Sequence, residues 1–180
     1  MDVDGPDTGT DTKTGTDTKT SPDTTTGTGP AASELVEYLA RVRAHRSELR
    51  DSVAAVDDAL AAPIARGGAW RERVRAALAE LHHDFQDHIE LTEGRGGLYD
   101  KVRRGAPRLS GKVDRLTHEH LRYHEAIGGF LVVLEHGGTL ADLPVFREEV
   151  TALMGQLVRH RQTGSDLIYE AYQVDIGGSD

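Results

Sequence analysis

The sequence predicts an all-α protein: an up-down-up-down four-helix bundle that follows a disordered N-terminal tail. Apolar residues recur at helical spacing from Ser33 onward, no stretch alternates with period two, and the segments between the helical patterns are short. Short connections make consecutive helices antiparallel neighbours, which gives the bundle. With 180 residues, of which 37% are hydrophobic, the chain is long enough for one globular domain with a core.

The tail is expected over residues 1–32, and the bundle over residues 33–175. The tail is rich in Thr, Gly, Asp and Pro, and it repeats the sequence TGTDTK within Thr8–Lys19. A segment with almost nothing apolar to bury does not offset the entropy lost on ordering. An inert extension is the favoured interpretation, and a solubilising or tethering arm is the alternative.

The first two helices are marked by apolar stripes with start and stop signals. The first helix takes Ser33 as its N-cap and ends at Pro63. The second begins near Ala69, has a weak point at residues 93–97, EGRGG, and stops near residues 105–107. The inward stripe of the first helix comprises Leu35, Leu39, Val42, Leu49, Val53, Val56 and Leu60.

The last two helices follow the same logic. The third carries apolar residues from Leu109 to Leu134 and ends at the HGG of residues 136–138. The fourth begins around Asp142, has a proline in its first turn and continues to about Tyr172.

Composition excludes several classes of protein. A formal net charge of -9, with Arg interspersed among Asp and Glu, would repel a nucleic-acid backbone. The absence of Cys excludes disulfides, thiolate metal sites and catalytic cysteines. The N-terminus lacks the pattern of a signal peptide, and no apolar run is long enough to span a bilayer, so we expect a cytoplasmic protein without a membrane partner.

Histidine is unusually frequent, with nine in the chain. Each apolar stripe has a gap of about two turns that a histidine fills. These four histidines are His45, His88, His120 and His160. The turn between the first two helices and the turn between the last two lie at the same end of the bundle. Each of these histidines is 16 to 19 residues along its helix from that end, so their depths agree within about 5 Å. We therefore predict four inward imidazoles in one layer, joined by His124, which follows His120 by one helical turn.

Such a layer indicates a metal site, because close, buried imidazoles lose hydration and repel each other on protonation. Neutral imidazoles suit zinc, copper, iron or nickel, whereas added carboxylates favour iron or manganese and bridge two ions. The candidate carboxylates are Glu93 and Asp166, with Glu170 in reserve. Because neither spacing from the preceding histidine suits a regular helix, each requires a π-bulge or kink, near Gly94 and near Gly164-Ser165.

The other four histidines carry no predicted ligand role. His118 is expected in solvent, because it lies on the far side of the helix from His120. His136 is expected to place favourable charge at a helix C-terminus. His82 and His83 are expected at the surface.

This pattern resembles the hemerythrin-like (HHE) domain, an all-α bundle around a non-haem di-iron centre. The resemblance rests on histidines in all four helices, HxxxH in the third, and a carboxylate after the histidine in the second and fourth. It covers about Ser33 to Tyr172, and the phrases DHIELTEG, GLYDKV and RHRQTGSDLIYEAYQVDIGG are similar to a bacterial branch of the family. The sequence departs from the family at Thr92, where HxxxE is common, and at Gly164.

The resemblance also implies a ligand set. One iron takes His120, His124 and His160. The other takes His45 and His88. Glu93 and Asp166 bridge the two irons, and the iron with fewer histidines keeps an open position for dioxygen or peroxide.

The function implied is that of a di-iron protein that binds, senses or reacts with dioxygen, peroxide or nitric oxide. Its partner is then a small diatomic or peroxide ligand. One alternative is an iron or zinc handling module without gas chemistry, for which zinc or manganese also suits the site. Another is a metal-free helical interaction module. No enzyme class follows from the sequence.

Overall fold

The computed structural model describes residues 30–64, 67–136 and 142–172, and this part of the chain consists of helices joined by turns, without strands. The elements are α1 (Pro30–Ala61), α2 (Gly67–Glu93), α3 (Leu98–Gly105), the 3-10 helix η1 (Pro107–Leu109), α4 (Ser110–Glu135) and α5 (Leu143–Tyr172). Nearly all of the predicted tail, residues 1–29, lies outside the described residues.

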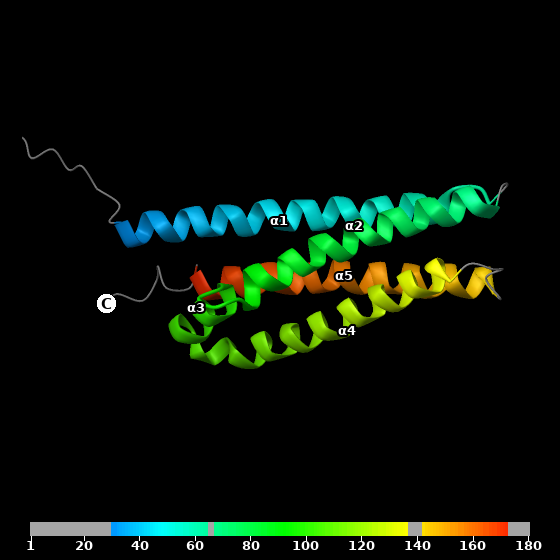
Figure 1. The fold of residues 1–180 in the computed structure, drawn as a ribbon. Coiled ribbons are helices and arrows are strands. Elements are labelled where there is room, and N and C mark those ends of the chain that lie inside the picture. Colours follow the sequence, from blue (N-terminus) through cyan, green and yellow to red (C-terminus); the bar gives the residue numbers. More distant parts are fainter. Residues whose placement is uncertain (1–29, 65–66, 137–141, 173–180) are drawn as a thin grey trace, which may run out of the picture.

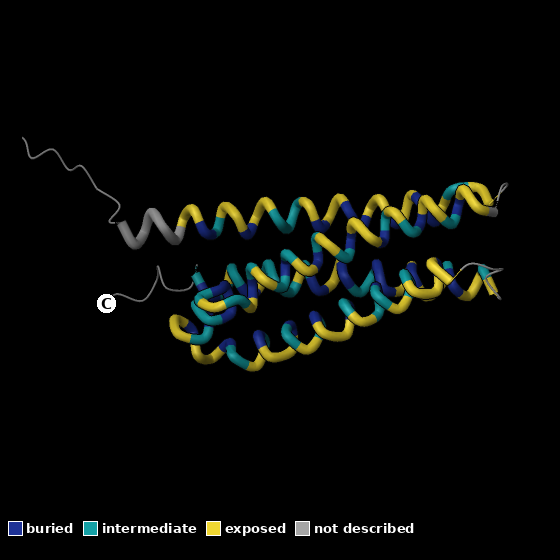
Figure 2. The backbone as a smooth tube through the Cα atoms, viewed as in Figure 1, coloured by how far each residue is buried: buried dark blue, intermediate teal, exposed yellow. Residues whose placement is uncertain are grey.

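The four long helices form the predicted bundle. Successive long helices run in opposite directions, with the α1–α2 and α4–α5 turns at one end and α3 at the other (Figure 1). The helices bury one face each and leave the opposite face exposed (Figure 2). The all-α, up-down-up-down prediction is therefore confirmed.

Two helix boundaries differ from the sequence prediction. Helix α1 begins at Pro30, so Ser33 lies within its first turn and is not the N-cap. Proline suits a first turn because its fixed φ is helical and its missing N–H would have no partner there. The weak point at residues 93–97 is a complete break, since α2 ends at Glu93 and α3 begins at Leu98.

The α2–α3 break depends on glycines. Gly96 has φ +71°, in the left-handed region, and the Gly97 N–H donates to the Gly94 carbonyl at 2.7 Å. A Cβ at Gly97 would lie 2.7 Å from the backbone oxygens of both Gly94 and Thr92. The turn therefore accepts only glycine at this position without moving the backbone.

We expect Gly97→Ala to lower the free energy of unfolding by about 1–3 kcal/mol, because the methyl group forces the turn open. Gly129→Ala is the matched control, since a Cβ at Gly129 within α4 meets nothing within 4 Å. That variant should gain about 0.5–1 kcal/mol from the lower entropy of the unfolded chain. Urea unfolding measures both, and equal stability of the two variants would contradict the assignment.

The core consists of two apolar clusters, one on each side of a polar layer. The cluster toward the α1–α2 turn includes Leu49, Phe85 and Leu157, and the cluster toward α3 includes Val42, Leu116 and Leu167. In α1, α4 and α5, a histidine of the predicted layer falls in sequence between residues of the two clusters. Apolar packing above and below thus fixes the depth of the layer.

Candidate metal centre

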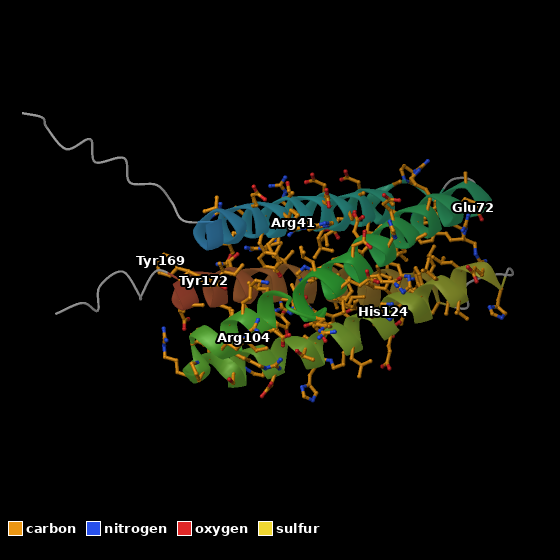
Figure 3. The ribbon with its side chains drawn as sticks, turned by 60° about the vertical axis from the view of Figure 1, so that its left-hand side comes forward. Arg41, Glu72, Arg104, His124, Tyr169 and Tyr172 are labelled. Carbon is orange, nitrogen blue, oxygen red and sulfur yellow. The ribbon has the colours of Figure 1, made fainter. Side chains whose placement is uncertain are left out.

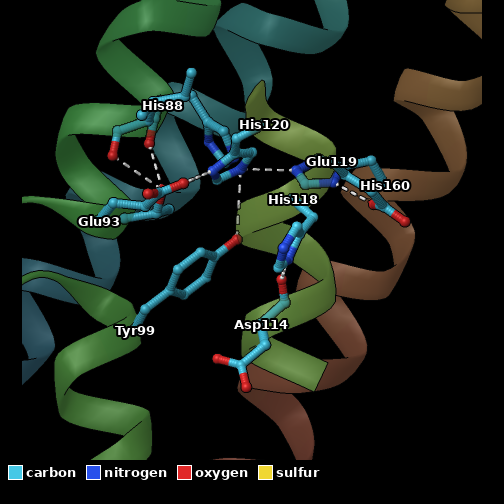
Figure 4. Close-up of polar contacts among 10 residues, drawn as sticks. His88, Glu93, Tyr99, Asp114, His118, Glu119, His120 and His160 are labelled. Carbon is cyan, nitrogen blue, oxygen red and sulfur yellow. Dashed lines mark hydrogen bonds and ion pairs between the residues drawn. The ribbon is translucent and has the colours of Figure 1, made fainter. Parts of the chain in front are cut away.

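Three histidines from three helices meet in this layer. They are His88 of α2, His120 of α4 and His160 of α5, and one ring nitrogen of each lies within 4.8 Å of the others. The side chains are almost completely buried, with relative exposures of 7%, 1% and 3%. Their ring centroids are 4.7 to 5.8 Å apart (Figure 4).

Two carboxylates orient two of these rings, those of His120 and His160. The Nδ1 atom of His120 contacts Glu93, and the Nδ1 atom of His160 lies 2.7 Å from Glu119 (Figure 4). A carboxylate that accepts the Nδ1 hydrogen fixes the tautomer and directs the Nε2 lone pair toward the centre of the bundle. This pairing is characteristic of histidines that bind metal ions.

The two Nε2 atoms of His120 and His160 face each other at 2.9 Å. If both Nδ1 atoms carry a hydrogen for their carboxylates, two lone pairs meet, and a proton or a metal ion has to lie between them. Two neighbouring nitrogen ligands at about 2.1 Å from one ion, at right angles, are about 3 Å apart. The observed separation therefore fits a shared metal ion.

The third imidazole, that of His88, has a buried nitrogen atom, Nε2, without a hydrogen-bond partner among the described residues. Leaving a buried polar atom unpaired costs about 1–3 kcal/mol, which a metal–nitrogen bond would offset. Burial lowers the pKa of His88 to about 3, and electrostatic interactions with His160, Arg46 and His45 act in the same direction.

Burial likewise lowers the pKa of His120 to about 2, with further contributions from His88 and His160. The pKa of His160 is also lowered by burial, against the opposing effect of Glu119. Neutral imidazole is the form that binds a metal ion. The three nitrogen donors and the adjacent carboxylates thus fit a transition-metal cation, in chemistry and in spacing.

Two predicted histidine ligands lie outside this cluster. His45 Nδ1 is 2.9 Å from Glu48, one turn along α1, and the His45 side chain is 34% exposed. His124 of α4 (Figure 3) lies against His82 of α2, with ring centroids 4.4 Å apart and an angle of 34° between the rings. His82 is partly exposed, in keeping with the surface position expected for it, and the contact with His124 covers part of its ring.

The predicted carboxylates have different positions. Glu93 reaches His120 because α2 ends at this residue, and no π-bulge is needed. Helix α5 continues as regular α-helix through Gly164 and Ser165, so Asp166 stays exposed and accepts a hydrogen bond from Gln162 at 2.9 Å. The reserve candidate Glu170 pairs with Lys112 instead.

Other predictions for single histidines agree with the structure. His118 is exposed, and its Nδ1 lies 2.7 Å from the Asp114 carbonyl oxygen. His136 caps α4, with Nδ1 2.7 Å from the Val132 carbonyl oxygen. His83 is exposed and lies 3.7 Å from Asp87.

Sequence reasoning missed Glu119 and Tyr99. Glu119 directly precedes His120, and this adjacency was the available signal for a second carboxylate at the same level of α4. Tyr99 of α3 stacks on His120, and its hydroxyl lies 3.5 Å from His120 Nε2. Burial raises the pKa of Tyr99, so its hydroxyl remains a hydrogen-bond donor at neutral pH.

Thr92, which stands where the family commonly has Glu, has a local role. Its hydroxyl donates to the backbone carbonyl of His88 at 2.7 Å. It therefore supports the last turn of α2 and offers no charge to the centre. The carboxylates come from Glu93 and Glu119 instead.

A helical bundle with buried histidines and flanking carboxylates at mid-depth belongs to the class of helical-bundle metal-binding domains. The family model of the hemerythrin HHE cation-binding domain matches residues 34–171, and the chain belongs to this family. No curated protein and no solved structure matches the chain significantly. In the described part of the chain, none of the helices combines the length and the apolar character needed to cross a membrane.

Proposed function

We propose that the protein is a non-haem di-iron protein that binds, senses or reacts with dioxygen, peroxide or nitric oxide. The observation that carries the proposal is the contact between His120 and His160, whose Nε2 atoms face each other at 2.9 Å while carboxylates hold both Nδ1 atoms. Membership of a cation-binding family supports it. Iron, when bound, supplies the redox chemistry toward these small ligands.

The residues have distinct roles in this proposal. His88, His120 and His160 provide imidazole nitrogens, while Glu93 and Glu119 orient two of the rings and are within reach as oxygen ligands. His45 and His124 would join after their rings leave Glu48 and His82. In the ligand set that the family implies, His124 would join His120 and His160 on one iron, and His45 would join His88 on the other.

The apolar clusters on both sides of the layer keep the three histidine rings almost completely buried, whereas Glu93 and Glu119 stay partly exposed. Phe85 lies against all three histidine rings, with centroid distances of 5.6 to 6.2 Å. A dry site limits unwanted proton transfer and strengthens the electrostatic interactions within it. This protection is what binding or sensing of a reactive small ligand requires.

A second candidate is an iron or zinc handling module without gas chemistry. The observation that favours it is that the structure brings three histidines together, which is the donor number of a single metal site. In this case His45 and His124 keep their present contacts.

The deciding experiment is elemental analysis of anaerobically purified protein, with its ultraviolet and visible spectrum before and after exposure to air. We expect about two irons per chain and a charge-transfer band that depends on oxygen. One ion per chain, or zinc without an oxygen-dependent band, would support the handling module. If the protein contains no metal and a chelator does not change its thermal stability, the result would support a metal-free helical interaction module.

A further inference from the structure

The end of the bundle that α3 closes is basic, and we call residues 95–115 the basic end. They contain seven Lys and Arg side chains and two Asp, in a chain whose formal net charge is -9. This stretch includes α3, η1 and the first turns of α4 (Figure 1). Positive charge is therefore concentrated here, in contrast to the mixed charges of the chain as a whole.

Most of these charges are not neutralised within the bundle. Asp114 pairs with Arg103 at 2.8 Å, and Glu170 of α5 pairs with Lys112. None of the ion pairs formed among the described residues includes the other five basic side chains, which are Arg95, Lys101, Arg104, Arg108 and Arg115. All of these except Lys101 are exposed, and Arg104 is labelled in Figure 3. The basic end thus presents positive charge to any anionic segment that reaches it.

The opposite end of the bundle has an excess of negative charge. Residues 51–61, 67–76, 131–136 and 142–150 meet there, and together they contain eight acidic and four basic side chains. An acidic segment is repelled from that end and attracted to the basic end. The charges of the bundle therefore select one end for an acidic partner.

An acidic segment of the same chain adjoins the basic end. Helix α1 begins at Pro30, and its start lies at the same end of the bundle as α3 (Figure 1). The 29 residues before it contain six Asp and two Lys. Chain of this length spans up to about 100 Å when extended, so it is long enough to reach the whole of the basic end.

We propose that residues 1–29 dock on the basic end of their own chain, across the exposed face of α3, η1 and the first turns of α4. Arginine suits this contact because its guanidinium forms paired hydrogen bonds with Asp carboxylates. Exposed ion pairs are individually weak, but a tethered segment binds at an effective concentration of about a millimolar. The docked segment covers the basic end and shields it from other polyanions. This contact is independent of the metal centre and of the function proposed for it.

The test measures the distance between the segment and the basic end in the full-length chain. The chain has no Cys, so Thr16→Cys provides a single site for a nitroxide spin label. Paramagnetic broadening of backbone amide signals is recorded by NMR, and the spectrum with the reduced label corrects for any bound metal ion. We expect broadening at residues 98–115 and none at residues 51–61.

Salt should weaken the contact, because it is electrostatic and exposed. We expect the broadening at residues 98–115 to fall at least about threefold between about 0.1 M and about 1 M salt, as the Debye length falls from about 10 Å to about 3 Å. Broadening that is equally strong at both salt concentrations would overturn the charge-based docking.

Arg104→Gln combined with Arg115→Gln removes two exposed charges from the basic end and should reduce the broadening at least about twofold. Arg73→Gln combined with Arg75→Gln is the matched control, because it removes the same charge near the α1–α2 turn. The control should leave the broadening unchanged. Circular dichroism of both double variants establishes that the helices remain intact.

The segment itself provides the complementary variant. Its charge is reduced by four substitutions, Asp4→Asn, Asp7→Asn, Asp11→Asn and Asp17→Asn. We expect this chain to lose the broadening at residues 98–115 and to bind a short DNA duplex more tightly than wild type, because the basic end is uncovered. No broadening in wild type, with a DNA duplex bound equally tightly by both chains, would overturn the docking and assign the basic end to an external polyanion.

Discussion

We expect His120→Asn to lower the affinity for the first metal ion by more than about 100-fold, because groups that only orient a ligand already contribute about 10–100-fold. His120 is 1% exposed, and its Nε2 faces that of His160. Asparagine cannot place a nitrogen lone pair at the same point. Competition with a chelator of known affinity, followed by elemental analysis, measures the loss.

Glu119→Gln provides the graded comparison. It keeps an acceptor near His160 Nδ1 but removes the charge, so we expect a loss of about 10–100-fold, smaller than for a direct ligand. His118→Asn is the control on the same helix, because its ring is exposed and bonds only locally to the Asp114 carbonyl. It should bind metal as wild type does.

The opposite order of effects would point to another ligand set. If His120→Asn bound metal as wild type does while His124→Asn lost it, the metal would lie at the α2–α4 contact between His124 and His82. Circular dichroism of each variant establishes that the helices remain intact.

The sequence alone predicted the depth of the histidine layer, because that depth depends only on helical rise and on gaps in the apolar stripes. His88, His120 and His160 lie where this counting places them. The counting does not give the direction of a side chain at the edge of a helix face. His45 occupies such an edge and turns to Glu48 at 2.9 Å.

The periodicity of the sequence did not predict which side chains of different helices contact each other. His124 lies against His82, and Glu119 of α4 reaches His160 of α5, because of helix rotations that no spacing rule specifies. A π-bulge or kink was predicted near Gly94 and near Gly164-Ser165, and only the first of these places departs from a regular helix. Helix α2 ends at Glu93, which frees that side chain, whereas α5 has no break and keeps Asp166 in solvent.

The metal-free protein should lose stability as the pH falls below about 6.5, and His88 gives the clearest case. Its pKa is about 3 in the folded chain, compared with 6.5 for the unfolded reference. Between these values the unfolded chain binds a proton that the folded chain does not. Stability is therefore complete above pH 6.5 and decreases as the pH falls toward 3.

Through His88, the free energy of unfolding should fall by about 1.4 kcal/mol per pH unit, or by about 3 kcal/mol between pH 6.5 and pH 4. His120 acts in the same direction, because its pKa is lowered to about 2. Glu93 opposes this trend, since burial raises its pKa and the folded chain takes up that proton first. Urea unfolding at a series of pH values measures the sum.

His88→Gln should flatten this pH dependence by about one proton, because glutamine does not titrate, whereas His118→Gln, in solvent, should leave it unchanged. An identical slope in wild type and His88→Gln would show that His88 is already protonated or accessible in the fold. In the metal-loaded protein the same protons compete with the ion, so acid should release metal before the helices unfold. The histidine layer thus makes the metal-free bundle acid-sensitive, because the folded chain keeps imidazoles neutral at pH values where the unfolded chain protonates them.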